Sequence, residues 1–326
     1  MIHFRSFRNT DPPLLAAIWQ SQSPQPGLRQ PVSVDLLEQL VLAKPYFHYP
    51  GLILACEDRH PIGFIHAGFG PNDEETALQT DYGVICLLMV RPDCPQAEVA
   101  EGLLRQAERY LTDRGAKVLY GGGVWPLCPF YLGLYGGSKL PGVLLSDSLA
   151  QQLYPTHGYR EVDRTLVFQC TVDLFRPPVH RGMIQVRRSM RVKSFMDPRP
   201  RSWWEACLMA NFSQMLFHLV PKEGGQPVAW AMLRDLEPEG TSTLRAVGLL
   251  ELEVSPPYRG QGMATFLISE IFRYLQSLGV EMVETQTMAR NHAAVNLYQK
   301  LGFVETNQGI VFRKDHPSVE CIHSAK

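Results

Sequence analysis

The pattern of apolar and polar positions along the chain changes period many times, between short runs typical of strands and longer stretches with helical spacing. In the first half, short apolar runs bounded by glycine, proline or charged residues predict strands at residues 2–7, 52–56, 62–67, 84–90, 118–120 and 165–172. Helical spacing and start signals predict helices at residues 12–20, 34–43, 97–114 and 148–154. Strands and helices are therefore mixed along this half.

A proline pair predicts a linker at residues 176–182, and beyond it much of the order of elements starts again. Strands are predicted at residues 184–187, 215–220, 228–233, 249–254, 282–286 and 310–313, and helices at residues 203–210, 264–278 and 293–301. A chain of 326 residues is long for one compact domain and suits two of about 150 residues each. We therefore expect one domain at residues 1–175 and a second at residues 183–326.

Residue matches between the halves indicate an internal duplication. Tyr154 and its neighbours match Tyr298 and its neighbours at one constant spacing, whereas Val90 and its neighbours match Val254 and its neighbours at a longer spacing. The change of spacing places an insertion in the first half between the two matches, and the Gly- and Pro-rich segment 121–142 is the obvious candidate. This segment carries four aromatic residues, and it is either a wall or lid of a substrate site or a self-packed surface loop.

Composition narrows the possible partners and compartments. The chain has 31 Lys and Arg against 32 Asp and Glu, so it has no global field that would attract nucleic acid or an anionic membrane. No apolar stretch is long enough for a membrane span, and the N-terminus lacks the apolar core of a signal peptide. Seven scattered cysteines without a Cys-x-x-Cys pair argue against a disulfide framework or a zinc site. We expect a cytoplasmic protein without a metal.

The stretch from residue 249 to residue 264 predicts an anion site. A strand ends at Val254, two prolines stop the sheet ladder, and a turn with Gly260 and Gly262 leads at once into a helix. The first amide groups of such a helix lack partners and converge on one point, where the helix dipole adds positive charge. A pyrophosphate fits this cradle, and Arg259 supplies a full charge beside it.

Two other interpretations of this stretch compete. A tight strand-to-helix turn with an exposed arginine needs no ligand. A dinucleotide fold also places a pyrophosphate at such a turn, but the third glycine of its fingerprint is missing, and no acidic residue closes a strand about 20 residues later.

A second motif favours the pyrophosphate cradle over both of these interpretations. Residues 291–303 match the pattern Asn-x-x-Ala-x-x-Leu-Tyr-x-Lys-x-Gly-Phe at every named position, and the earlier turn matches Arg-x-x-Gly-x-Ala after Val-x-Pro. Together the two motifs resemble the GCN5-related N-acetyltransferase (GNAT) superfamily. The resemblance covers residues 183–314 well and residues 2–172 weakly, through the repeat.

The resemblance implies fold and activity. The fold would be α/β (α+β), with two tandem GNAT-like domains, each a mixed and mostly antiparallel sheet flanked by helices. The activity would be transfer of an acyl group, typically acetyl, from acetyl-CoA as co-substrate to a primary amine, without a metal. We expect a small-molecule acceptor whose identity the sequence leaves open.

The resemblance also implies roles for residues. The backbone of Leu252 and Val254 would pair with the pantetheine arm, Asn291 would contact the coenzyme, and Tyr298 would protonate the departing thiolate as general acid. The Leu252 amide would lie near the thioester oxygen. The pyrophosphate would be held by the amides of Arg259, Gly260, Gln261, Gly262, Met263 and Ala264.

The general base is less well marked. The family often has a carboxylate six residues before the motif valine, where this chain has Gly248. Glu251 and Glu253 have the opposite strand parity, so a bulge would be needed to turn either into the cleft. We expect Glu253 to act as the general base. The alternatives are a water chain or an acceptor that binds as the free amine. His292 and Glu284 are further candidates that fit a solvated or structural role better.

The first copy has lost the cradle. It contains no glycine at the turn, and Glu98 stands where Gly262 stands in the second copy, with Asp93 close by. These carboxylates would repel a phosphate, so Tyr154 has a packing role in this interpretation. The architecture resembles tandem members such as mycothiol synthase, with a degenerate N-terminal and a catalytic C-terminal domain. A catalytically silent acyl-CoA-binding regulator and an interaction scaffold remain as alternatives.

Overall fold

The computed structural model describes residues 1–58, 60–177, 181–236 and 244–315. Two kinds of element build the first half. Its strands are β1 (Ile2–Ser6), β2 (Leu52–Glu57), β3 (His60–Pro71), β4 (Leu78–Val90), β5 (Val118–Gly121), β6 (Val143–Leu144) and β7 (Arg160–Thr171). Its helices are α1 (Pro12–Gln20), α2 (Val34–Leu37), η1 (Glu38–Leu42), η2 (Tyr49–Gly51), α3 (Gln96–Asp113) and α4 (Ser148–Thr156).

The second half repeats this order. Its strands are β8 (Met190–Met196), β9 (Gln214–Pro221), β10 (Ala229–Leu236), β11 (Ala246–Val254), β12 (Met282–Met288) and β13 (Val304–Asp315). Its helices are α5 (Arg181–Ser189), α6 (Trp203–Met209), η3 (Pro256–Tyr258), α7 (Met263–Ser277) and α8 (His292–Lys300). Within the described residues no helix is long and apolar enough to cross a membrane.

The predicted duplication is confirmed by the bounds of the elements. Helices α4 and α8 begin and end at the spacing that separates Tyr154 from Tyr298, and so do strands β7 and β13. The ends of strands β4 and β11 have the longer spacing that separates Val90 from Val254, and so do the starts of strands β5 and β12. The additional residues of the first half lie between β5 and α4, where the insertion was predicted.

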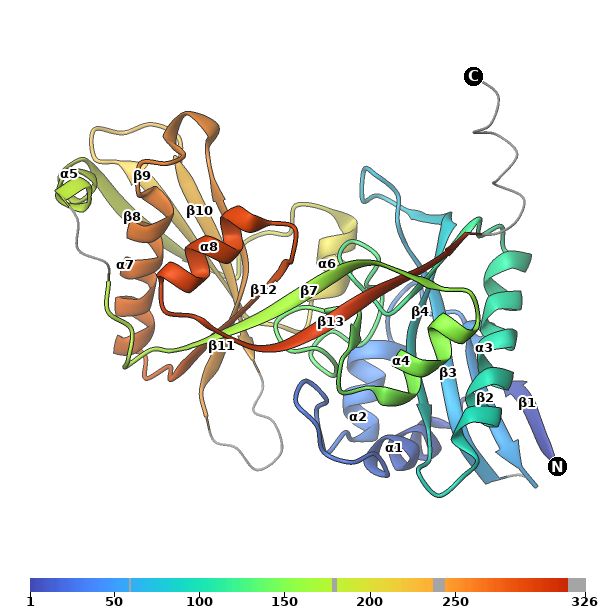
Figure 1. The fold of residues 1–326 in the computed structure, drawn as a ribbon. Helices are drawn as coiled ribbons and strands as arrows, with labels where there is room; N and C mark the ends of the chain where they lie inside the picture. The colour runs from blue at the N-terminus through green and yellow to red at the C-terminus, as the bar shows by residue number, and fades with distance from the viewer. Residues whose placement is uncertain (59, 178–180, 237–243, 316–326) are drawn as a thin grey trace.

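The two copies exchange their last strands within one continuous sheet. Its strand order is β1-β2-β3-β4-β5-β13-β7-β12-β11-β10-β9-β8. Strand β7 ends the first copy but pairs with β12 of the second, and β13 ends the second copy but pairs with β5 of the first. Figure 1 shows β7 and β13 running side by side from one half to the other.

The exchanged strands carry core residues into the opposite half. Phe168 of β7 is buried in the second core, where its ring lies 6.0 Å from that of Tyr298. Phe312 of β13 is buried in the first core, where its ring lies 5.4 Å from that of Tyr154. Each tyrosine of the repeat therefore packs on a phenylalanine from the other half of the chain.

Helix α6 adds a further contact between the halves. The ring of Trp204 lies 4.9 Å from that of Tyr46, and the backbone amide of Trp204 donates to the carbonyl of Glu75. The Lys44 ammonium donates to the carbonyl of Cys207 at 2.6 Å, and burial lowers the pKa of this lysine to about 8. Helix α6 is thus held against the first half.

One predicted strand is wrong. Residues 184–187 lie inside helix α5, because Met183 and Val186, three residues apart, lie on one helix face and pack against the second core. The strand follows at β8 instead. Of the predicted linker 176–182, residues 178–180 lie outside the described residues, as do residues 316–326 of the predicted second domain. The boundaries of the two domains stay a prediction.

Candidate active site

Strand β11 contains the bulge that the sequence required for an acid in the cleft. Met232 of β10 pairs with Glu251, but the next residue, Leu233, pairs with Leu249, so that Leu250 has no partner. The additional residue shifts the side-chain parity of the strand on one side of the bulge. Leu250, Glu251 and the two residues after them all line one cavity.

Strands β11 and β12 separate directly before this segment. Their parallel pairing runs from Ala246 to Leu249, and the hydroxyl of Thr285 donates to the Leu249 carbonyl at 3.0 Å where it ends. Leu252 and Val254 lie beyond this point and are half-buried. The backbone that is predicted to pair with a pantetheine arm therefore faces the gap between two diverging strands.

The turn before α7 has the geometry of an anion cradle. Gly260 and Gly262 have φ values of 73° and 80°, in the left-handed region that favours glycine. Among the described residues, no acceptor bonds the backbone amides of Gly260, Gln261, Gly262, Met263 and Ala264. A Cβ on Gly260 would meet no atom within 4 Å, so the space over the turn is open.

Helix α8 brings the second motif to the cavity lined by β11. Asn291 caps the helix, its side chain accepting the amide of Ala294 at 3.2 Å. Tyr298 is 6% exposed, and burial raises the pKa of its phenol, while an interaction with Thr285 opposes this shift. Both Asn291 and Tyr298 line the cavity.

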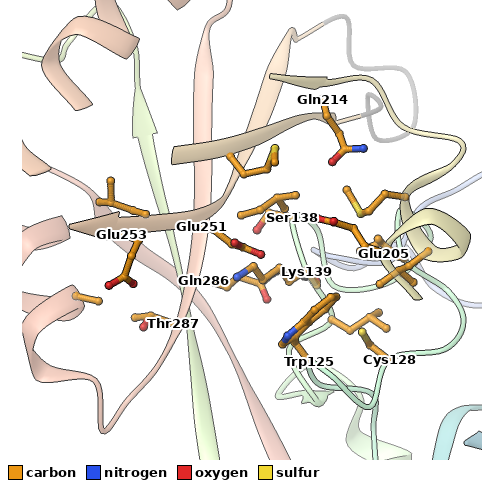
Figure 2. Close-up of a pocket in the computed structure, with 18 of the residues that line it drawn as sticks. Trp125, Cys128, Ser138, Lys139, Glu205, Gln214, Glu251, Glu253, Gln286 and Thr287 are labelled. Atoms are coloured by element: carbon orange, nitrogen blue, oxygen red, sulfur yellow. Dashed lines mark hydrogen bonds between the residues drawn. The ribbon is translucent and has the colours of Figure 1, made fainter. Parts of the chain in front are cut away.

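The cavity has a volume of about 470 Å³ and lies between the two halves of the chain. Figure 2 shows side chains from both halves around it, among them Trp125 and Lys139 from the first half and Glu251 and Gln286 from the second. The insertion thus forms one wall of this cavity, in agreement with one of its two sequence interpretations, whereas a substrate at this wall stays a prediction. Its contributions are Trp125, Cys128, Leu132, Ser138, Lys139 and Leu140.

The rest of the insertion packs into the core of the first half, so the other interpretation, a self-packed surface loop, is wrong. Phe130 and Tyr131 are buried in the first half, where they cover His66. The Tyr131 hydroxyl lies 3.0 Å from Nδ1 of His66, and burial lowers the pKa of this histidine to about 3. His66 pairs with Leu87 directly before the bulge, as Met232 pairs with Glu251 in the second copy, so His66 corresponds to Met232, which lines the cavity. The inserted aromatic residues therefore fill in the first copy a space that stays open in the second.

The two glutamates of β11 have different partners. Glu251 binds Arg201 through two bonds of 2.8 and 2.9 Å, and Arg201 also binds the buried Glu205. Glu253 binds Arg259 through one oxygen at 2.7 Å, while its other oxygen has no bond among the described residues. A carboxylate held at both oxygens by a guanidinium is a poor base, so the geometry favours Glu253 over Glu251.

The missing acid at Gly248 has a steric cause. A Cβ at this position would lie 2.7 Å from the Cβ of Ser138, which belongs to the insertion. Glu284, an alternative candidate, is buried away from the cavity and accepts the Ser138 amide at 2.6 Å and the Gln169 side chain at 3.2 Å. His292 is exposed at the start of α8. Glu284 therefore has the structural role and His292 the solvated position that the sequence favoured.

The predicted cradle residue Arg259 also differs in its contacts from the expectation. Its guanidinium donates to the Val254 carbonyl at 3.0 Å and to Glu253 at 2.7 Å. Two residues predicted for separate tasks, phosphate binding and proton transfer, are thus in direct contact. Because both side chains are more than half exposed, this pair contributes little to stability.

Sequence reasoning missed the cavity residues Lys139, Glu205 and Gln286, together with Arg201, which holds two of the glutamates. Their signal is weak, because they lie outside both motifs. The insertion between the two anchored matches was the available hint for Lys139. No group of three His, Cys, Asp or Glu side chains in the described part of the chain could hold a metal ion.

The comparisons with known proteins agree on one family. The model of the acetyltransferase (GNAT) family matches residues 15–124 and 183–303, more than half of the chain. The [ribosomal protein bS18]-alanine N-acetyltransferase of Escherichia coli strain K12 is 25% identical over 118 residues, which are 36% of this chain and 73% of that protein. An uncharacterized N-acetyltransferase of Bacillus subtilis, YdgE, is 29% identical over 97 residues, or 29% of this chain and 59% of that protein.

Solved structures share the tandem fold. A tandem GNAT protein from the clavulanic acid biosynthesis pathway has a TM-score of 0.65 at 13% identity, covering 97% of this chain and 98% of that one. A GCN5-related N-acetyltransferase from Sphaerobacter thermophilus has a TM-score of 0.62 at 16% identity, covering 96% and 95%. At this identity the likeness shows the fold, which confirms the predicted fold class of two tandem GNAT-like domains.

Proposed function

The chain belongs to the acetyltransferase (GNAT) family, with a match in each half, and on that premise we propose that its second half is an acetyl-CoA-dependent N-acetyltransferase. The acceptor is a primary amine of a small molecule. One observation carries the proposal: the amides at Gly260 and Gly262 have no acceptor among the described residues, and β11, the strand that leads into their turn, lines a cavity together with Tyr298. The residues present fit a coenzyme A diphosphate at the turn, because the amides lack acceptors and the space over Gly260 is open.

Acetyl-CoA supplies a thioester whose carbonyl carbon the amine attacks, so that a C–N bond forms and the C–S bond breaks. The Tyr298 phenol, which is protonated at neutral pH, gives its proton to the departing sulfur, and burial raises the pKa of this phenol further. The free oxygen of Glu253 takes the proton that the amine loses. The Leu252 amide on β11 stabilises the negative charge on the carbonyl oxygen.

The acid role is tested by comparing Tyr298→Phe with Tyr154→Phe, its counterpart in the first half. We expect Tyr298→Phe to lower turnover about 100-fold or more with unchanged affinity for coenzyme A, and Tyr154→Phe to leave turnover alone. Turnover is measured as thiol release from acetyl-CoA with a panel of primary amines, and affinity by calorimetry. Because burial raises the pKa of Tyr298, we expect no loss of the acid up to about pH 9.

The same measurement separates the enzyme from a silent acyl-CoA-binding regulator. A regulator would bind coenzyme A but release no thiol with any amine, whether or not Tyr298 is present. The absence of an acid at Gly248 no longer favours the regulator, because Ser138 occupies the space into which that side chain would project. Equal turnover in the wild type and Tyr298→Phe would remove the acid role.

A further inference from the structure

The insertion places Lys139 in the cavity on a fixed backbone. Gln286 donates to the Lys139 carbonyl at 3.1 Å, and Arg234 donates to the preceding carbonyl, that of Ser138, at 3.0 Å. Glu284 accepts the Ser138 amide at 2.6 Å. All three of these second-half side chains are buried. These bonds hold the backbone of Ser138 and Lys139 from three buried side chains, so the position of Lys139 is set by the opposite half of the molecule.

The ammonium of Lys139 has no anionic partner. Among the described residues no carboxylate forms an ion pair with it, and no acceptor bonds its Nζ atom. Lys139 is also the one Lys or Arg side chain among the described residues that line this cavity. Burial lowers the pKa of the ammonium, and the nearby charge of Glu251 counteracts this only in part. An anion bound here would relieve the cost of burying the charge.

The neighbouring acidic groups do not fill that role. Glu205 and Glu251 are both bound to Arg201, whose guanidinium lies 5.4 Å from the ring centre of Trp230. Their remaining negative charge disfavours a dianion such as a phosphate next to Lys139, whereas a singly charged carboxylate needs only one cation. The charges therefore favour a carboxylate.

The cavity offers separate places for an amine and an acid. Glu253 and Tyr298 line it from the second half, next to the predicted thioester position, whereas Lys139 lines it from the first half, beside Trp125. Building on the proposed function, we propose that the acceptor carries a carboxylate in addition to its amine, and that Lys139 binds this carboxylate. Lys139 is then a specificity-determining residue that the first, non-catalytic copy contributes to the site of the second.

The test uses pairs of acceptors that differ in one charge. ω-Amino acids with one to five methylene groups are compared with the amides of the same acids, with thiol release from acetyl-CoA as the readout. A charge-assisted bond predicts that kcat/KM for the preferred acid exceeds that for its amide about 10- to 100-fold, chiefly through KM. Lys139→Met should bring this ratio to about one, and Lys139→Arg should keep part of it.

Lys117→Met is the matched control, because this lysine is exposed and pairs with Asp81 on the surface of the first half. It should leave the ratio as in the wild type. Thermal unfolding of each variant verifies that it folds. Equal kcat/KM for acids and amides in the wild type, or an equal loss for both in Lys139→Met, would overturn the carboxylate anchor while leaving the acetyltransferase proposal intact.

If no amine is acetylated, the proposed function fails. The role of Lys139 in carboxylate binding is then tested by a binding measurement. Calorimetry with 4-aminobutyrate and 4-aminobutyramide, in the presence of coenzyme A, then compares the wild type with Lys139→Met. Tighter binding of the acid that depends on Lys139 supports the anchor. Equal binding of acid and amide, or no binding of either, contradicts it.

Discussion

In the first half, helix α3 packs directly on helix α4, whereas the corresponding helices α7 and α8 of the second half make little or no direct contact. The strand ends beside them differ accordingly. Val90 of β4 is completely buried, but its counterpart Val254 is half-buried at the edge of the gap. Both copies keep the same β-bulge, at Cys86 and at Leu250. The bulge is thus common to both copies, whereas the open gap is a feature of the second copy, where the coenzyme is predicted to bind.

The turn at the start of the long helix explains how the gap closed. Helix α3 begins at Gln96, which corresponds to Gly260, so it starts earlier in its copy than α7, which begins at Met263. Residues that form an open turn in the second copy are helical in the first. The side chain of Gln96 then donates to the Val90 carbonyl at 3.1 Å. Without the two glycines, the first copy has an ordinary helix start where the second copy has an open turn.

The largest expected effect concerns the folding of the first half in the absence of the second. A fragment of residues 1–175 lacks β13, whose Ile310 and Phe312 are buried in its core. Its own strand β7 would also lose its partners β12 and β13. We expect the fragment to show no cooperative thermal transition by circular dichroism, whereas the two fragments 1–175 and 183–326, expressed together, should assemble into one particle. A monomeric fragment 1–175 that melts cooperatively would show that the exchanged strand is dispensable.

The second prediction moves the lost feature from one copy to the other. Gly262→Glu copies Glu98 of the first half, and we expect it to weaken coenzyme A binding at least about 100-fold in calorimetry. Two effects add up: a non-glycine residue at φ 80° costs about 1–2 kcal/mol, and a carboxylate near the diphosphate repels it by a few kcal/mol more. Gly262→Ala isolates the backbone effect and should cost about 5- to 30-fold.

The reverse change provides the control for this comparison. Glu98→Gly should not create coenzyme binding in the first half, because the gap there is closed by α3 and α4 and not by the charge alone. A second binding event in Glu98→Gly would mean that the first cleft can open. Unchanged affinity in Gly262→Glu would mean that the turn at Gly260 and Gly262 does not hold the diphosphate.

The two motifs of the candidate site could be predicted from the sequence for a physical reason. The cradle and the Tyr298 motif are contiguous segments, in which spacing along the chain determines which groups lie together. Strand β11, which leads into the cradle, and Tyr298 line one cavity, although the roles of both motifs stay predictions. The contacts between Ser138 and Gly248, or between Arg201 and Glu251, join residues far apart in the chain and depend on how an insertion folds. No local pattern records such contacts.

The exchange of strands was beyond sequence reasoning for a related reason. Strand β7 has the same apolar pattern whether it pairs with its own copy or with the other, because the repeat makes both partners similar. The error at residues 184–187 is of another kind. Ile184 and Val186 alternate as in a strand, but the spacing of Met183 and Val186 fits a helix equally well, and packing against the second core favours the helix.

The smallest expected effect tests the exchange of strands β7 and β13. A substitution in the first half should affect the site in the second half, and the corresponding substitution in the second half should not. Phe168→Leu changes a residue of the first half, yet we expect it to lower turnover several-fold, because Phe168 packs on Tyr298. Phe312→Leu changes the second half, yet it should leave turnover unaffected, because Phe312 packs on Tyr154. Both are swaps within apolar cores and should cost a similar amount of stability, about 1–1.5 kcal/mol or less, which makes each the control for the other. Thiol release and thermal unfolding measured on both variants give the comparison. If turnover followed the half of the chain instead of the tyrosine in contact, with Phe312→Leu slower than Phe168→Leu, the exchanged strands would not support the site that they are packed against.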